Sequence, residues 1–167
     1  MLNISFHKYK GNANMKNTKK LLAVALAFYL SSSFVALVAI LQNTVNNFFW
    51  LINQGFEVSS IIFLTSVFHD IKGGSLFYAI ILVTLFVAFC TAALLRSIIP
   101  LGGHLSYGLA GLVGLYTMIN ITLYVFDGIA VIGSLRNGFG LSVFCFIGGI
   151  GGFLFESLKN IFLRRTV

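Results

Sequence analysis

The sequence predicts an all-α integral membrane protein: a bundle of four transmembrane helices, with both termini inside and an amphipathic helix on the outer side. Only 9% of the residues are charged and 58% are hydrophobic, with a mean hydropathy of +0.97, whereas a soluble domain carries about 25% charged residues. Four apolar runs have spanning length, and lysines and arginines gather beside them. So few charges cannot cover a water-facing surface, which excludes a soluble globular enzyme.

The four apolar runs are residues 21–41, 75–95, 105–126 and 138–157. Each has about 20 residues, the length of helix that crosses a hydrocarbon core of about 30 Å. The second and third runs contain no charge, and the fourth contains only Glu156, near its end. The transmembrane domain is therefore expected over residues 21–158, between a basic N-terminal tail (1–20) and a basic C-terminal tail (159–167).

Two parts of the beginning of the chain, residues 1–14 and the run 21–41, each allow two interpretations. Residues 1–14 are polar and irregular in pattern, and MKNTKK at 15–20 is typical of a bacterial start, so 1–14 is either an untranslated extension before Met15 or a disordered tail after Met1. The run 21–41 is either a first span or a signal peptide cleaved near the serines at 31–33. Because the apolar run continues beyond these serines, we expect an uncleaved helix.

The basic residues predict the orientation. With the N-terminus inside, only Lys72 and Arg136 fall on the outer face. Segments rich in lysine and arginine remain in the cytoplasm, so both tails are expected on the cytoplasmic side of a bacterial inner membrane. The inner residues are Lys8, Lys10, Lys16, Lys19, Lys20, Arg96, Lys159, Arg164 and Arg165. The short inner segment around Pro100 makes the second and third spans antiparallel neighbours.

The outer segment 43–57 has an amphipathic helical pattern. Its apolar face comprises Val45, Phe48, Phe49, Ile52 and Phe56, and its polar face comprises Asn43, Asn46, Asn47, Asn53, Gln54 and Glu57, with Trp50 among them. It is either a lid or partner-docking helix at the outer headgroups, or a connector or extension of the first span. The apolar piece 61–68 that follows is too short to span and is expected to be re-entrant or interfacial.

Small residues mark where the helices can approach closely. In the third span they are Gly108, Ala110, Gly111 and Gly114, and in the fourth they are Gly148, Gly149, Gly151 and Gly152. Lipid tails are as apolar as leucine, so membrane helices associate through such residues and through a few hydrogen bonds. We expect packing within the bundle, with a homo-oligomer or partner interface as the alternative.

The third span also carries a polar stripe of Tyr116, Asn120 and Tyr124, spaced four residues apart. A side-chain amide in the hydrocarbon region must find a hydrogen-bond partner. The candidates for Asn120 are Thr84 on the second span and Ser142 on the fourth. The stripe is interpreted either as a polar contact between helices or as the lining of a small polar pocket.

The residues that enzyme chemistry needs are scarce in the sequence. Four acids and three histidines form no catalytic or metal-binding motif, so no catalytic residue, metal or cofactor is expected. Cys90 and Cys145 lie at different depths of different spans, too far apart for a disulfide. Glu156 is expected to pair with Lys159 at the inner end of the fourth span. No basic domain is available to bind nucleic acid.

These patterns favour a non-enzymatic accessory, assembly or envelope-stability factor that acts through helix packing. Its expected partners are the lipid bilayer and either a membrane protein or further copies of itself. The alternative is a small oligomeric channel or transporter that uses the polar stripe.

Overall fold

The computed structural model describes the backbone of residues 3–127, 133 and 138–166, and the side chains of 17–127, 133 and 138–165. This part of the chain is helical and has no strand. The helices are α1 (Asn3–Asn53), α2 (Ser60–Gly73), α3 (Ser75–Leu95), α4 (Gly103–Val125) and α5 (Gly138–Thr166). The predicted all-α bundle is confirmed. Arg136 lies outside the described residues, as do the side chains of Lys8, Lys10 and Lys16.

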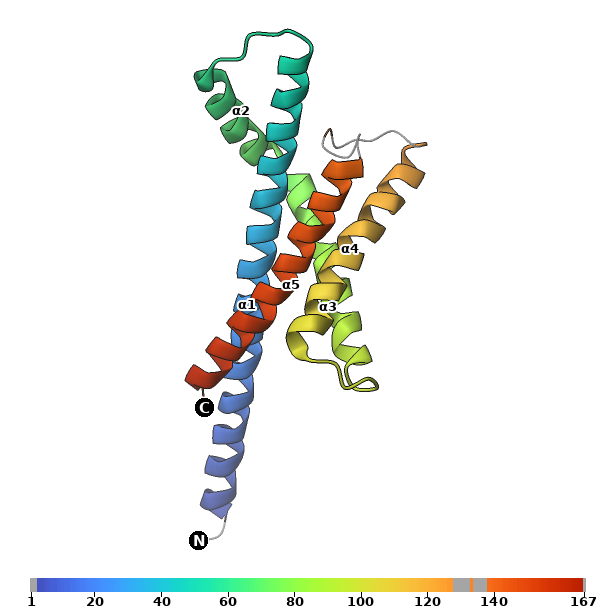
Figure 1. The fold of residues 1–167 in the computed structure, drawn as a ribbon. Coiled ribbons are helices and arrows are strands. Elements are labelled where there is room, and N and C mark those ends of the chain that lie inside the picture. Colours follow the sequence, from blue (N-terminus) through green and yellow to red (C-terminus); the bar gives the residue numbers. More distant parts are fainter. Residues whose placement is uncertain (1–2, 128–132, 134–137, 167) are drawn as a thin grey trace.

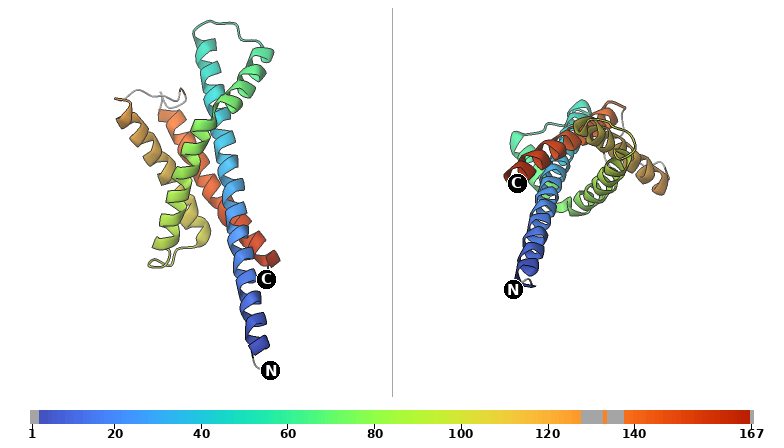
Figure 2. Two further views of the ribbon diagram at one scale, coloured as in Figure 1. Left: turned by 180° about the vertical axis from the view of Figure 1, so that it is seen from behind. Right: turned by 90° about the horizontal axis from the view of Figure 1, so that it is seen from below.

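Four long helices form the bundle, and α2 stands apart from it (Figure 1). Helix α5 packs against both α4 and α1, and α3 packs against α4 and α1. Both termini lie at the same end as the turn between α3 and α4, which carries Arg96 (Figures 1 and 2). We call this the basic end, because Lys159 and Arg165 also lie near it, and we call the opposite end, where α2 lies, the far end.

Helix α1 is longer than the sequence predicts. It runs unbroken through residues 3–14, where an irregular segment is expected, and through 43–53, where a separate amphipathic helix is one alternative. Of the two alternatives for the outer segment, the structure has the extension of the first span, and the irregular pattern expected before Met15 is replaced by helix from Asn3 onward. The physical reason is that residues 12–54 contain neither glycine nor proline, and extending an existing helix costs far less than starting one.

Helix α1 ends in a glycine turn. Gly55 adopts φ +83°, a conformation that glycine reaches without strain. The amide of Phe56 donates to the carbonyl of Leu51 at 3.2 Å, and the amide of Gly55 donates to the carbonyl of Ile52 at 2.9 Å. This pair of bonds is the Schellman motif that closes many helices. The chain then turns back into α2, so the predicted interfacial piece 61–68 is part of a 14-residue helix.

Four helices of the described chain are long and apolar enough to cross a membrane. The longest window, Asn17–Asn53, has 37 residues, so it extends roughly 55 Å, nearly twice the ~30 Å hydrocarbon core. Fully buried side chains such as Val35, Leu85 and Phe144 fill the centre of the bundle. The outward faces are also apolar, with Leu76 and Phe146 among their exposed residues, as expected for helices surrounded by lipid.

Candidate functional site

The helices α4 and α5 approach each other closely where glycines face each other. A β-carbon added to Gly111 would collide with the carbonyl group of Gly148, and one added to Gly148 would collide with the carbonyl oxygen of Gly111. Gly152 lies in the same way against the backbone of Tyr107. Backbones that approach this closely gain van der Waals contact along the whole crossing. These glycines are therefore engaged within the chain.

The other small residues of the two spans serve more than one interface. A β-carbon on Gly108 would lie 2.6 Å from the ring of Phe153 on α5, and one on Gly114 would lie 2.9 Å from Ala88 on α3. Gly149 makes ordinary contacts with α4, and Ala110 packs against the buried core. Gly151, in the same glycine-rich run, faces Val35 of α1.

The predicted polar cluster on the third span does not assemble. The exposed Asn120 donates its side-chain amide to the carbonyl of Tyr116, one turn earlier in α4, at 2.8 Å. Ser142 donates to a carbonyl of its own helix at 2.9 Å, and Thr84 lines a groove between α3 and α4. Tyr116 is 49% exposed and Tyr124 87%. The predicted partners are wrong because residue spacing defines a helix face without showing whether that face points into the bundle.

A buried carboxylate joins three helices at the basic end. Glu156 of α5 is only 4% exposed, and it forms an ion pair with Lys159, as predicted. The structure adds Asn160, whose amide donates to Glu156 Oε1 at 3.3 Å, and Arg96 at the end of α3, whose Nη1 lies 3.6 Å from the same oxygen. Gly103, the first residue of α4, lies against this carboxylate with no room for a side chain.

Aromatic rings surround the same charges. The Lys159 ammonium lies 4.6 Å from the centre of the Tyr107 ring, and the Phe89 and Phe155 rings stack with centroids 4.8 Å apart. A cation over an aromatic face gains electrostatic attraction where water is scarce. The cluster therefore fastens α3, α4 and α5 together at the basic end. The sequence analysis does not predict the contact between Arg96 and Glu156. The signal that could have found it is the place of Arg96 among the basic residues expected at the same depth as Glu156.

At the far end, α1 and α2 form a hairpin, residues 43–73, which we call the far-end hairpin. The buried hydroxyl of Thr44 donates to Asp70 Oδ2 at 2.6 Å, joining the two helices near its base. Further out, the rings of Phe48 and Phe63 meet edge to face, 5.0 Å between centroids. A groove of about 330 Å³ lies between the two helices. The hairpin is therefore held by one polar bond at its base and by an aromatic contact higher up.

Most of the far-end hairpin surface is apolar and uncovered. Helix α2 has no buried residue. Large side chains on both of its helices and in the connection between them are more than half exposed, including Phe49 at 62%, Phe56 at 60%, Ile61 at 77% and Phe68 at 70%. In a chain of membrane-capable helices, exposed apolar side chains of this kind meet either lipid or another protein.

The titratable side chains are dispersed in the described part of the chain. Within it, no group of three or more histidine, cysteine, aspartate or glutamate side chains is placed to hold a metal ion. Cys90 is exposed and Cys145 is buried, and both are free thiols. The chemically distinct places among the described residues are thus the Glu156 cluster and the far-end hairpin.

The fold and these sites define a multi-pass helical membrane protein. Comparison with protein-family models, with curated proteins and with solved structures found no match to the chain.

Proposed function

We propose that this protein is a non-enzymatic accessory or assembly factor of a bacterial cytoplasmic membrane, which docks onto a larger membrane protein through its far-end hairpin. The observation that carries the proposal is α2, an apolar helix of 14 residues without a buried side chain. Helices gain most of their stability in proteins by burying an apolar face. A face left uncovered within the chain is available to a partner.

The position of the hairpin supports docking outside the hydrocarbon core. With the basic end in the cytoplasm, a core of about 30 Å that begins beside Lys20 is crossed after about 20 residues of α1. The chain then reaches the polar residues Gln42 and Asn43. The hairpin beyond them faces headgroups or water on the outer side, where covering apolar surface is favourable by about 25 cal/mol per Å².

The composition of the hairpin indicates what kind of partner fits. Its only charged or titratable residues are Glu57, His69, Asp70 and Lys72, and Asp70 is already engaged with Thr44. Its large exposed apolar side chains include Phe49, Trp50 and Phe68, and aromatic residues are enriched in protein interfaces. The partner surface is therefore expected to be apolar and to lie near the outer membrane–water boundary.

Site-specific photo-crosslinking in the native membrane tests this proposal. A photoreactive residue at Phe49 or Ile61 is expected to give a discrete protein adduct that mass spectrometry identifies. Matched controls at Phe86 and Leu94 are similarly exposed, at 58% and 71%, but lie on α3, where lipid is the expected neighbour. Phe49→Ser and Ile61→Ser are expected to release the same partner when the complex is purified in mild detergent.

Two results would contradict docking through the hairpin. One is crosslinking to lipid alone at Phe49 and Ile61, which would place the hairpin in the bilayer surface. The other is an identical set of protein adducts at the α3 control positions, which would show a partner along the spans instead.

The second candidate is a small oligomeric channel or transporter. It is favoured by the outward position of the stripe formed by Tyr116, Asn120 and Tyr124 on α4. In a ring of copies, outward stripes can face a common axis, and polar residues inside a membrane often mark pathways. Flux through liposomes that contain the purified protein tests it. Asn120→Leu is expected to abolish flux, and flux that is absent from the unaltered protein or unaffected by this change would contradict it.

A further inference from the structure

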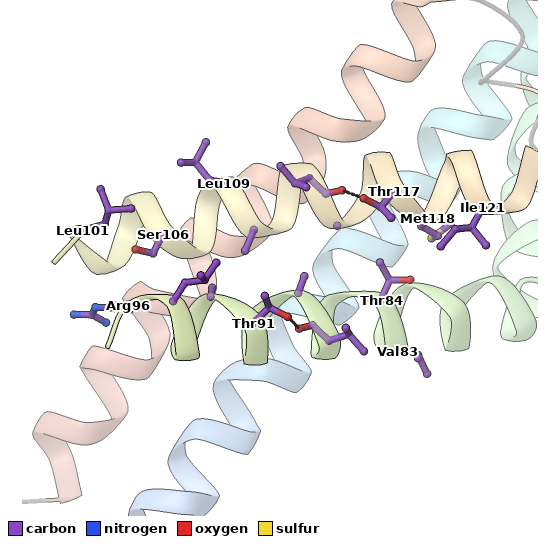
Figure 3. A pocket seen from close by; sticks show the side chains of 17 residues that line it. Val83, Thr84, Thr91, Arg96, Leu101, Ser106, Leu109, Thr117, Met118 and Ile121 are labelled. Atoms are coloured by element: carbon purple, nitrogen blue, oxygen red, sulfur yellow. Dashed lines mark hydrogen bonds between the residues drawn. The ribbon is translucent and has the colours of Figure 1, made fainter. Parts of the chain in front are cut away.

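A groove lies between α3 and α4 (Figure 3), with a volume of about 550 Å³. Its wall includes the small residues Ala88, Ala110 and Gly114. Thr91 and Thr117 also line it, and their hydroxyls donate to carbonyls of their own helices at 2.8 Å. Along most of its length the groove therefore requires no polar ligand.

The dimensions of the groove fit a hydrocarbon chain better than a helix. On α3 the lining extends from Val83 to Arg96, a length of roughly 20 Å along the helix axis. A helix with its side chains is about 10 Å wide, whereas a single acyl chain is much narrower. The carbons of an acyl chain, which pack at about 3.5–4.0 Å from their neighbours, fit such a groove.

The groove becomes polar only at the basic end. Arg96 lies there at the end of α3, and Ser106 lies across from it on α4 (Figure 3). The Arg96 side chain is 40% exposed, and its contact with Glu156 is long, at 3.6 Å. Because Glu156 already pairs with Lys159, this corner retains a net positive charge. The hydroxyl of Ser106 is buried and has no hydrogen-bond partner, although a buried polar group normally has one.

We propose that the groove binds an anionic phospholipid of the inner leaflet. One acyl chain lies between α3 and α4, the phosphate sits at Arg96, and the Ser106 hydroxyl donates to an oxygen of the lipid. Basic pockets between membrane helices on the cytoplasmic side bind anionic headgroups in this manner. The inference rests on the proposed orientation, with the basic end in the cytoplasm, but not on docking through the far-end hairpin, which lies at the other end of the molecule.

Native mass spectrometry of the full-length protein tests the proposal, with phosphatidylglycerol as the anionic probe and phosphatidylcholine as the zwitterionic one. Phosphatidylglycerol is expected to bind more tightly. Arg96→Gln is expected to raise its dissociation constant about tenfold, since hydrogen bonds to charged groups are the stronger ones. Arg164→Gln is the matched control: it removes a charge at the same end without touching the groove, and it is expected to leave binding unchanged.

Three further variants separate the groove from the general charge of the basic end. Ala110→Phe fills the groove and is expected to weaken both lipids, whereas Ser106→Ala is expected to weaken phosphatidylglycerol about two- to tenfold. Arg96→Lys keeps the charge and is expected to restore part of the preference, which separates lost binding from lost folding.

The proposal is overturned if the unaltered protein binds both lipids equally or if Arg164→Gln weakens binding as much as Arg96→Gln does. It is also overturned if the spectra show a dimer without lipid that Ala110→Phe dissociates, because a second copy would then occupy the groove.

Discussion

Gly111 of α4 and Gly148 of α5 face each other across the bundle, and the carbonyl oxygen of each occupies the space that the other's β-carbon would need. Helix α5 also packs against α1, so a shift of α5 would disturb its contacts with both neighbouring helices. Close backbone contact at this point therefore holds the central helix of the bundle in register with α4.

We expect Gly148→Ala and Gly111→Ala to destabilise the protein by about 1–3 kcal/mol or more, the usual cost of overpacking. The measurement is the free energy of unfolding in mixed micelles with increasing SDS. Gly73→Ala is the matched control, because a β-carbon there meets nothing within 4 Å. Equal stability of the Gly148 and Gly73 variants would show that the crossing tolerates separation.

Glu156→Gln is expected to lower the free energy of unfolding by about 1–3 kcal/mol, because it leaves the Lys159 charge without its carboxylate. The Lys159 side chain is only 13% exposed, whereas that of Arg96 is 40% exposed. Arg96→Gln is therefore expected to cost less, about 1 kcal/mol or below, as for exposed ion pairs. SDS unfolding curves compare the two, and a larger loss for the Arg96 variant would contradict the burial argument.

Thr44→Val is expected to free α2 from α1 without disturbing the bundle. The change removes the donor of the 2.6 Å bond to Asp70 and leaves the half-buried carboxylate without that partner, which costs about 1 kcal/mol. Hydrogen–deuterium exchange is expected to rise across α2 while α4 and α5 stay protected. Thr65→Val is the control, because Thr65 donates only within α2, to the carbonyl of Ile61. Equal exchange in both variants would contradict an anchor at Thr44.

Asn120→Leu is expected to change the free energy of unfolding by less than about 0.5 kcal/mol, as for exposed positions without special contacts. Its amide bonds only to the carbonyl of Tyr116 in its own helix, at 2.8 Å. SDS unfolding of the variant checks this. A loss of more than 1 kcal/mol, as for a hydrogen bond between helices, would show that Asn120 has a partner on another helix.

The pair formed by Glu156 and Lys159 was predicted correctly from the sequence, whereas the polar cluster predicted around Asn120 was not. Residues three apart on one helix are neighbours, so the pairing of Glu156 with Lys159 follows from local geometry alone. The predicted cluster required Asn120 to bond to a residue of another helix. The spacing of Asn120 relative to Tyr116 and Tyr124 carries no information about the rotation of α4 in the bundle, so that pairing could not be predicted. The contact between Arg96 and Glu156 is visible only in the tertiary structure, because the two residues are far apart in the sequence.

The sequence by itself determined the class of fold: its scarce charges, four apolar runs and clustered basic residues define a helical membrane protein, since the bilayer imposes length and polarity on each span separately. The tertiary structure decided which faces meet. Only the packed helices show that Gly111 faces Gly148, that α2 is left uncovered and that α3 and α4 leave a groove ending at Arg96. These relations depend on helix rotation and crossing, which are set by contacts between segments distant in the chain.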